Sequence, residues 1–233
     1  FSGESMLTLG GVGDTIPMKN LRVGDVVLAV EERRDGSFDI IETEVIVFLD
    51  RKPNAEGVNY IHLSARTTDG ESMEINMTPN HLLFVLPRDP DCALVPCEPV
   101  SMHAGAIQAG AIIFVRTIAS DGKSKIVSAT VEKVAYQKHT GAYAPLTKSG
   151  TILVDNVVVS SYALGDAANK ITHSAAHAAF SPVRVLYELG RVAGTVLPTW
   201  HEGKIPSYQD GVHWYAEALT SLYPAAVSLG FLS

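Results

Sequence analysis

Apolar residues in the first 165 positions fall into short runs rich in β-branched side chains, and turn signals separate these runs. Such runs are typical of an all-β domain, because branched and aromatic side chains fit a pleated surface. Asp-Gly pairs at 35–36, 69–70 and 121–122 predict hairpin turns. The predicted strands are Val26 to Val30, Glu42 to Phe48, Tyr60 to Ala65, Ser72 to Met77, His81 to Leu86, Ile112 to Thr117, Ile126 to Ala135 and Thr151 to Val159.

One apolar pattern occurs twice, 86 residues apart (from 21 to 107). Its members are Leu21, Gly24 and Val26, which recur as Ile107, Gly110 and Ile112. The same offset separates Ile41 from Val127, Val45 from Val131 and Phe48 from Val134. A constant offset over two segments predicts a duplicated unit, with two similar β subdomains facing each other. Chance matching of apolar residues is the alternative.

The pattern changes near Gly165, where β-branched runs end and alanine, leucine and histidine become frequent. Ser181-Pro182 precedes apolar residues at helical spacing, namely Val183, Leu186, Leu189, Val192 and Val196. A second amphipathic stretch runs from Trp214 to Leu222. We therefore expect a β domain over 1–165 and a small helical region over 166–233. The helices could bury an apolar ligand, lie on a membrane, or pack back on the β domain.

Composition excludes several classes of protein. With 46% apolar and 18% charged residues, the 233-residue chain can bury a large core, which excludes intrinsic disorder. The net charge of −7 and the lack of a Lys/Arg cluster argue against a nucleic-acid partner. No apolar run of about 18 residues is present, so a membrane-spanning helix is not expected, whereas contact with a membrane surface stays open.

Two features of the chain concern its processing and its compartment. Cys92 and Cys97 lie in one proline-rich loop, where they form either a local disulfide or two free thiols. These two cysteines are not expected to form a disulfide framework or a four-ligand zinc site. The chain begins Phe-Ser-Gly without an initiator methionine, so we expect it to derive from a longer precursor.

Two polar residues at strand ends are candidates for proton transfer. His81 opens an apolar strand directly after Thr78-Pro79-Asn80, and a near-neutral imidazole in a fixed position suits a general acid or base. Asp50 ends the apolar run that starts at Val45, where desolvation would raise the pKa of a carboxylate. The alternatives are a core histidine and a strand-ending Asp paired with Arg51.

Two other candidates are weaker. His173 and His177 are four residues apart, as two metal ligands on a helix would be, but no glutamate follows His173 and no third ligand is evident. Ser160 and Ser161 lack the G-x-S-x-G context of a hydrolase nucleophile. We expect neither a metal nor a cofactor.

Read together, several segments resemble the C-terminal autoprocessing domain of hedgehog precursors. They follow in the family's order over almost the whole chain, and the tail segments correspond to the family's sterol-recognition region. The segments are Phe1-Ser2-Gly3-Glu4-Ser5, Met18-x-x-Leu21-x-x-Gly24-Asp25-x-Val27-Leu28, Phe48-Leu49-Asp50-Arg51, Thr78-Pro79-x-His81-Leu82, Ala144-Pro145-Leu146-Thr147-x-x-Gly150-Thr151, Ser160-Ser161-Tyr162-Ala163, His177 through Pro182 to Arg184, and Gly211-Val212-His213-Trp214-Tyr215-Ala216.

The resemblance implies a Hint fold of two pseudo-symmetric β subdomains, and a two-step reaction in cis. A cysteine thiol attacks the preceding glycine carbonyl to give a thioester, which a sterol hydroxyl then displaces. By matching positions, His81 and Thr78 would polarise the scissile amide and protonate its nitrogen, and Asp50 would accept the sterol proton. Such catalysis is needed because an amide nitrogen leaves poorly and an alcohol is a poor nucleophile.

The resemblance also implies partners and a location. The partners are cholesterol or a related sterol, an upstream signalling domain in cis and a membrane surface; the location is the secretory pathway at the endoplasmic reticulum, with secretion of the released fragment. The tail residues expected to contact the sterol are Trp214, Tyr215, Leu219 and Leu222.

Two departures from the family pattern are visible. The nucleophilic cysteine would lie immediately before Phe1 and is absent from this chain, and Ser161 stands where the family usually has cysteine. The chain as written therefore cannot form the thioester. Two other functions stay open, namely a related domain that uses another lipid or water as acceptor, and an inactive fragment that binds sterol or membrane.

Overall fold

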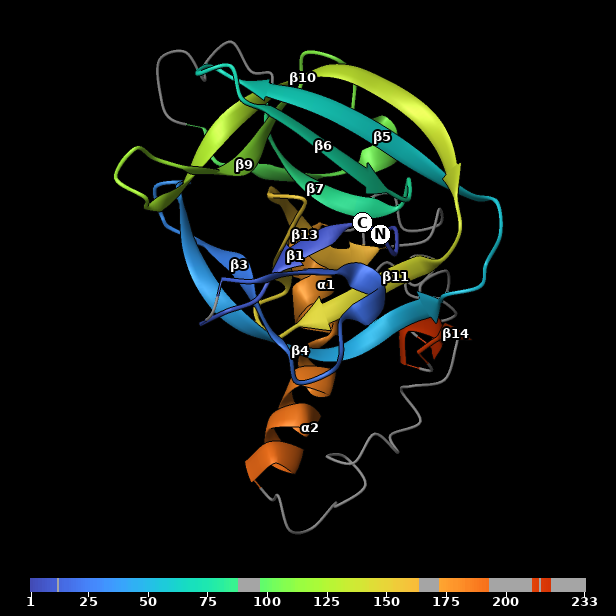
Figure 1. Cartoon of the computed structure of the whole chain (residues 1–233). Helices are drawn as coiled ribbons and strands as arrows, with labels where there is room; N and C mark the ends of the chain where they lie inside the picture. The colour runs from blue at the N-terminus through green and yellow to red at the C-terminus, as the bar shows by residue number, and fades with distance from the viewer. Residues whose placement is uncertain (12, 88–96, 164–171, 193–210, 214, 219–233) are drawn as a thin grey trace, which may run out of the picture.

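The computed structural model describes residues 1–11, 13–87, 97–163, 172–192, 211–213 and 215–218. Most of them lie in long curved strands, and helices α1 (His173–Ala179) and α2 (Ser181–Val192) follow late in the chain (Figure 1). The strands are β1 Met6–Thr8, β2 Thr15–Pro17, β3 Val26–Glu32, β4 Phe38–Lys52, β5 Val58–Thr67, β6 Ser72–Met77, β7 His81–Leu86, β8 Val100–His103, β9 Ile112–Ile118, β10 Ser124–His139, β11 Ala142–Thr147, β12 Thr151–Val154, β13 Val157–Ala163 and β14 Gly211–Val212. The expected mainly β class is confirmed.

The strands within the described residues form three sheets. The largest has the order β12-β13-β7-β9-β10-β5-β6, with β8 paired to β7. A smaller sheet has the order β11-β4-β14, with β3 paired to β4, and β1 pairs with β2. Figure 1 shows the two larger sheets stacked one above the other, with the start of the chain between them.

Hydrogen bonds repeat at the offset seen in the sequence. Gly24 N donates to Val45 O at 2.8 Å, and 86 residues later Gly110 N donates to Val131 O at 2.7 Å. Short 3-10 helices precede both bonds, at Met18–Asn20 and Ala104–Ala106. The hairpins β3–β4 and β9–β10 share the same register. The duplicated unit predicted from the sequence is therefore confirmed in this part of the fold.

The second half of each unit is exchanged with its counterpart. Strand β5 follows β4 in the chain but pairs with β10, while β11 follows β10 but pairs with β4. The chain therefore crosses from one sheet to the other after β4 and again after β10, and each sheet is completed by the other unit (Figure 1). This exchange brings residues near 50 and near 143 side by side.

One predicted strand is wrong. The run from Thr151 to Val159 is not continuous, because Asp155 and Asn156 have positive φ angles of 50° and 63° and form the turn between β12 and β13. Asp and Asn tolerate this left-handed region better than other side chains do, so the pair can act as a hairpin turn inside an apolar run. The predicted Asp-Gly turns are all confirmed, and Gly36, Gly70 and Gly122 have positive φ.

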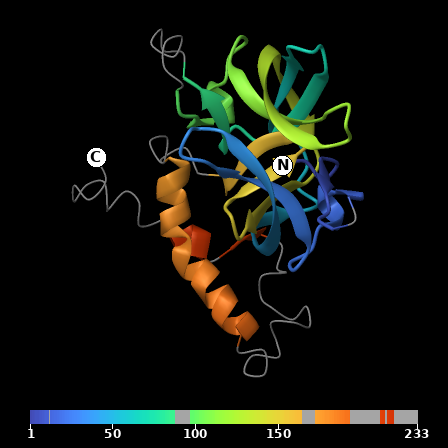
Figure 2. The same cartoon turned by 90° about the vertical axis from the view of Figure 1, so that its left-hand side faces the viewer.

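The helices share a core with the strands. Ala176 of α1 and Phe180, the residue that follows this helix, are buried in one cluster with Leu82 and Tyr162. Figure 2 shows α2 extending away from the strands. On α2, Val183 and Tyr187 pack against this cluster, whereas Val185, Leu186 and Leu189 are more than half exposed. No helix in the described part of the chain has the length and apolar character needed to cross a bilayer.

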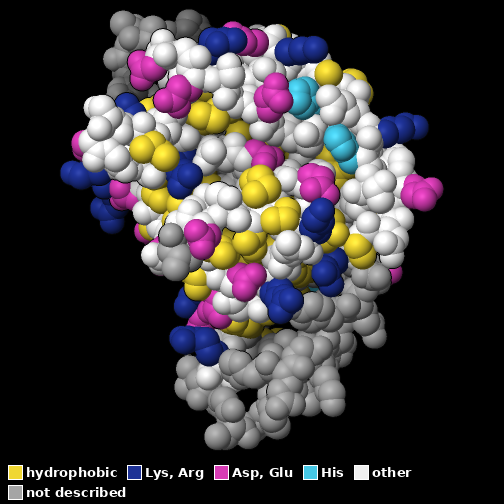
Figure 3. Space-filling model, viewed as in Figure 1, with side chains coloured by type: hydrophobic (Ala, Val, Ile, Leu, Met, Phe, Trp, Pro, Cys, Tyr) yellow, Lys and Arg dark blue, Asp and Glu magenta, His cyan; other side chains and the backbone are white. Residues whose placement is uncertain are grey.

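Basic and acidic side chains are interspersed with apolar ones on the face in Figure 3, so that face carries no large patch of one charge sign.

Cys97 is disulfide-bonded, which favours the local bridge over two free thiols. Cys92 lies outside the described residues.

Packing of α1 on the turn before β12 gives a test of the fold. A Cβ atom added at Gly150 would lie 2.3 Å from His177 Nδ1, and Gly150 has φ +80°. Gly122 has nearly the same φ, +79°, but nothing lies within 4 Å of its added Cβ. We expect Gly122→Ala to lower the free energy of unfolding by about 1–2 kcal/mol through backbone strain, and Gly150→Ala to cost a further 1–3 kcal/mol, roughly, through overpacking.

Urea unfolding of the two variants measures this difference. Equal losses of stability would mean that α1 is not packed on this turn in solution.

Candidate active site

Phe1 is fully buried, and its backbone atoms are hydrogen-bonded to residues of the two larger sheets. Its amino nitrogen donates to Tyr143 O at 2.5 Å, and its carbonyl oxygen accepts from Tyr143 N at 3.0 Å and from Tyr60 OH at 2.9 Å. In a chain that continues upstream, this nitrogen would be the amide of the bond preceding Phe1. The start of the chain is therefore held in one position inside the core.

His81 lies next to this nitrogen. Its Nε2 is 3.5 Å from Phe1 N, and the two rings are in contact with centroids 4.0 Å apart. On the other side, His81 Nδ1 shares a hydrogen bond of 2.7 Å with Thr78 Oγ1. The turn that ends at β7 also bonds His81 N to Thr78 O at 3.1 Å, which explains the spacing of three residues. Thr78 thus orients the imidazole toward Phe1.

Burial controls the charges in this site. It lowers the pKa of the Phe1 amino group to about 5, although the nearby carboxylates Asp50 and Asp155 oppose the shift. Burial, and then the charge of that amino group, lowers the pKa of His81 well below its ordinary value. The second cause disappears when the nitrogen is a peptide amide. A neutral imidazole that can exchange protons is therefore expected in the site.

Asp50 reaches the same region from β4. Its neighbours in the sheet are Ala144 of β11 and Val212 of β14, and its charge acts on the Phe1 amino group. One carboxylate oxygen, Oδ2, accepts from Lys52 Nζ at 3.0 Å, so the ion-pair partner is Lys52 and not Arg51, the partner in the alternative interpretation. The side chain is 30% exposed and can meet a ligand.

Three residues of this site were not predicted from the sequence. Tyr60 and Tyr143 bind the backbone of Phe1, and the single O–H of Tyr60 is shared between Phe1 O at 2.9 Å and Gly141 O at 2.6 Å. Asp155 accepts from Met6 N at 2.7 Å and thereby fixes the segment after Phe1. A tyrosine in a strand gives no local signal of this role. The only sequence hint for Asp155 was an Asp-Asn pair inside an apolar run.

Of the tail residues expected to contact a ligand, only Tyr215 is described; Trp214, Leu219 and Leu222 lie outside the described residues. Tyr215 OH donates to Ala179 O at 2.9 Å, and its ring packs on Phe180 with centroids 5.7 Å apart. Ser161 is fully buried, and its hydroxyl lies 3.0 Å from Thr147 Oγ1.

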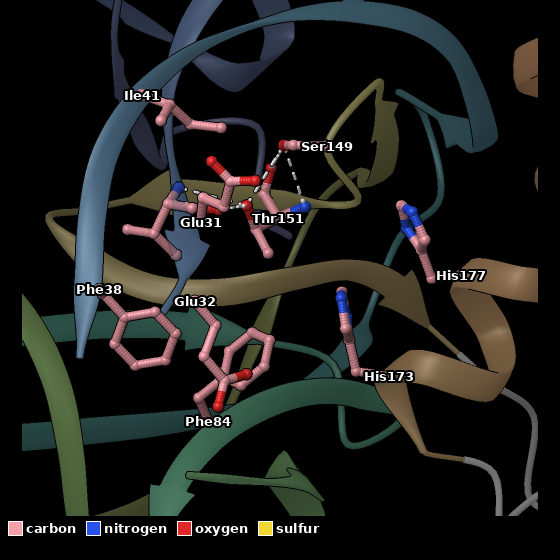
Figure 4. Close-up of a pocket in the computed structure, with 10 residues that line it drawn as sticks. Glu31, Glu32, Phe38, Ile41, Phe84, Ser149, Thr151, His173 and His177 are labelled. Carbon is pink, nitrogen blue, oxygen red and sulfur yellow. Dashed lines mark hydrogen bonds between the residues drawn. The ribbon is translucent and has the colours of Figure 1, made fainter. Parts of the chain in front are cut away.

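His173 and His177 line a different cavity of about 300 Å³, between β3, β4, β12 and α1 (Figure 4). Their Nδ1 atoms lie within hydrogen-bonding distance of hydroxyls, Ser160 Oγ at 2.9 Å and Tyr162 OH at 3.1 Å. Burial lowers the pKa of His173 to about 4. No group of three or more ligating side chains able to hold a metal occurs among the residues that the structure describes. Asp50, Thr78 and His81 do not line this cavity.

Known protein families and solved structures are similar to this chain. The family model of the Hint module matches residues 1–226. The chain belongs to the Hint family. This Hint domain is 32% identical over 222 residues to the Indian hedgehog protein of Xenopus laevis, covering 95% of this chain and 47% of that protein. It is 34% identical over 232 residues to the Indian hedgehog B protein of Danio rerio, again covering 95% and 47%.

The Hint domain thus spans a little under half the length of these curated relatives. Among solved structures, a mutant of the Ssp DnaB mini-intein is similar with a TM-score of 0.50 and 13% identity, covering 71% of this chain and 92% of the intein. At this identity the likeness concerns the fold alone. The expected Hint fold and the resemblance to hedgehog proteins are both confirmed.

The buried amino group predicts a dependence of stability on pH. Its pKa falls from 8.0 in the unfolded chain to about 5 in the folded one, so the unfolded state binds more protons between these values. The contribution of this group to the free energy of unfolding is therefore fully present above pH 8, and it is lost as the pH falls from 8 toward 5. Below pH 6.5 the neutral His81 adds a loss in the same direction. Urea unfolding midpoints measured from pH 8.5 to 5 test this.

A chain lengthened by one residue before Phe1 is the control, since an amide then replaces the amino group. The decline between pH 8 and 6.5 should be absent from the lengthened chain. The same slope in both chains would assign the effect to other groups.

Proposed function

We propose that this Hint domain cleaves the peptide bond ahead of a cysteine that precedes Phe1, and transfers the upstream polypeptide to a sterol. One observation supports this most directly. The nitrogen of Phe1 is buried 3.5 Å from His81 Nε2, while Asp50 approaches the same region from another strand. The resemblance to hedgehog precursors gives the order of the steps.

In the first step, the cysteine thiol attacks the carbonyl carbon of the preceding residue. A carbon–sulfur bond forms, the carbon–nitrogen bond breaks, and the leaving nitrogen gains a proton. His81, oriented by Thr78, polarises the amide and supplies or relays that proton. The burial of Phe1 holds the attacking cysteine next to the imidazole, which reduces the entropy cost of reaching the reactive geometry.

In the second step, a sterol hydroxyl attacks the thioester carbon. Asp50 accepts the hydroxyl proton, the thiol group of the cysteine leaves, and the upstream polypeptide becomes an ester. The carboxylate suits this role because its side chain is partly exposed and lies near Phe1. The region 166–233 would bind the sterol, with Trp214, Tyr215, Leu219 and Leu222 among the contacts, and residues 1–165 would carry the catalytic groups.

The partners follow from this reaction and from the relatives. The hedgehog names of the matched proteins suggest an upstream signalling domain in cis, and a membrane surface would supply the sterol. The reaction would then occur in the secretory pathway, at the endoplasmic reticulum, before the fragment is secreted.

A fusion experiment tests the proposal. A reporter domain followed by Gly-Cys is placed ahead of Phe1, and release of the reporter is followed with and without cholesterol. Release that depends on cholesterol supports the proposal. Release without sterol would indicate water or another acceptor, and no release would indicate a fragment that only binds.

Asp50→Ala in this fusion should block release by cholesterol and spare release by dithiothreitol. Dithiothreitol is itself a good nucleophile near neutral pH, so it needs no base to attack the thioester. The two release rates, measured on the same protein, give the comparison. Equal loss of both rates would contradict the assignment of Asp50 to the second step alone.

His81→Ala should slow both kinds of release, because protonation of the amide nitrogen precedes either one. Loss of a general acid typically costs about 10²–10⁴ in rate. Thr78→Ala, which leaves the imidazole without its partner, should give a smaller loss of the same kind. Release by dithiothreitol at the unmodified rate in His81→Ala would make His81 a core histidine.

A further inference from the structure

Residues of the tail add a strand directly beside Asp50. In β14, Gly211 pairs with Arg51 and Val212 pairs with Asp50, antiparallel to β4. The next residue continues the pairing, since His213 N donates to Leu49 O at 2.7 Å. Figure 1 shows β14 next to the end of β4, far along the chain from the strands that surround it.

The opposite side of this stretch of β4 faces the start of the chain. There β11 pairs Tyr143 with Arg51 and Ala144 with Asp50, and Tyr143 binds both backbone polar groups of Phe1. Asp50 therefore lies between the strand that holds Phe1 and the strand that belongs to the tail. Only β11 and β4 separate Phe1 from β14.

Pairing on the β11 side is irregular at this point. The register of β11 on β4 shifts between Ala144 and Pro145, next to Asp50, and again between Leu146 and Thr147. Proline has no N–H to donate, so this ladder lacks a donor beside Phe48. Strand β4 ends at Lys52, and β14 gives the stretch around Asp50 a second ladder besides that of β11.

The residues after β14 are anchored by side chains. Tyr215 donates to Ala179 O and packs on Phe180, and Tyr215 and Ala216 pack against the cluster that contains Leu49. His213 Nδ1 accepts from Tyr215 N at 3.3 Å, and His213 O accepts from Glu217 N at 3.1 Å. The segment is thus fixed at β4 and at α1.

We propose that β14 is a positioning strand, whose backbone hydrogen bonds hold the Asp50 stretch of β4 in place and bring the tail's acceptor to that carboxylate. This inference rests on the proposed function and names the contact through which the tail acts on the second step. Strand addition suits the task because main-chain bonds fix register whatever the side chains are. An error of about 1 Å in such a position can cost about 10²-fold in rate.

The test uses the full chain in the Gly-Cys reporter fusion. His213→Pro removes the N–H that donates to Leu49 O, whereas His213→Asn keeps this N–H and an acceptor for Tyr215 N. We expect His213→Pro to lower release by cholesterol by about tenfold or more, since displacement of a catalytic group has effects of this size. Release by dithiothreitol should be unchanged, and His213→Asn should restore release by cholesterol.

Amide hydrogen exchange of the unmodified protein gives a second measurement. The His213 amide should exchange slowly if it is bonded to Leu49 O in solution. Exchange at the rate of an unstructured peptide would overturn the proposal, as would equal release by cholesterol in the proline and asparagine variants. Loss of release by dithiothreitol in His213→Pro would also overturn it, because β14 would then belong to the fold as a whole.

The fusion without substitutions separates this inference from the proposed function. If that fusion does not respond to cholesterol, the proposed function fails. If it responds and the two His213 variants behave alike, only the role of β14 fails.

Discussion

Burial of the first residue imposes the main constraint on this structure. A backbone N–H or C=O group taken out of water costs free energy unless it finds a partner, and Phe1 brings both groups into the core. Tyr143 satisfies them from one strand and Tyr60 from another, while His81 lies against the ring and near the nitrogen. Strands β5, β7 and β11 must therefore lie close together around Phe1, and the two larger sheets are stacked so that they do.

The fold could be predicted from local signals where these were strong. Three Asp-Gly turns and the 86-residue repeat located most strands, because glycine at positive φ and apolar periodicity are properties of short segments. Other elements gave no such signal. Strand β11 contains Pro145 and β14 has two residues, so tertiary pairing with β4 decides both. The turn at Asp155 and Asn156 was missed because apolar residues flank it on both sides.

The candidate site divides in the same way. Thr78 and His81 are three residues apart, and a single turn joins them, so their contact follows from the sequence. Asp50 approaches Phe1 only because β11 of one unit pairs with β4 of the other, which no local pattern encodes. Tyr60 was predicted only as a strand residue, and Tyr143 lay outside every predicted strand. Their bonds to Phe1 depend on pairing between the two units.

Pairing between the two units also affects the time at which the domain can act. Strand β4 can pair with β11 only after about ninety further residues have been made, and β5 pairs with β10, which also lies later in the chain. Pairings so distant in sequence are slow to form, because loop closure costs entropy before contacts repay it. During synthesis, Phe1 emerges before the strands that enclose it and stays unenclosed until both units have been made. Any reaction that needs the enclosed Phe1 is therefore delayed until β10 and β11 have been translated. This delay requires no separate inhibitor.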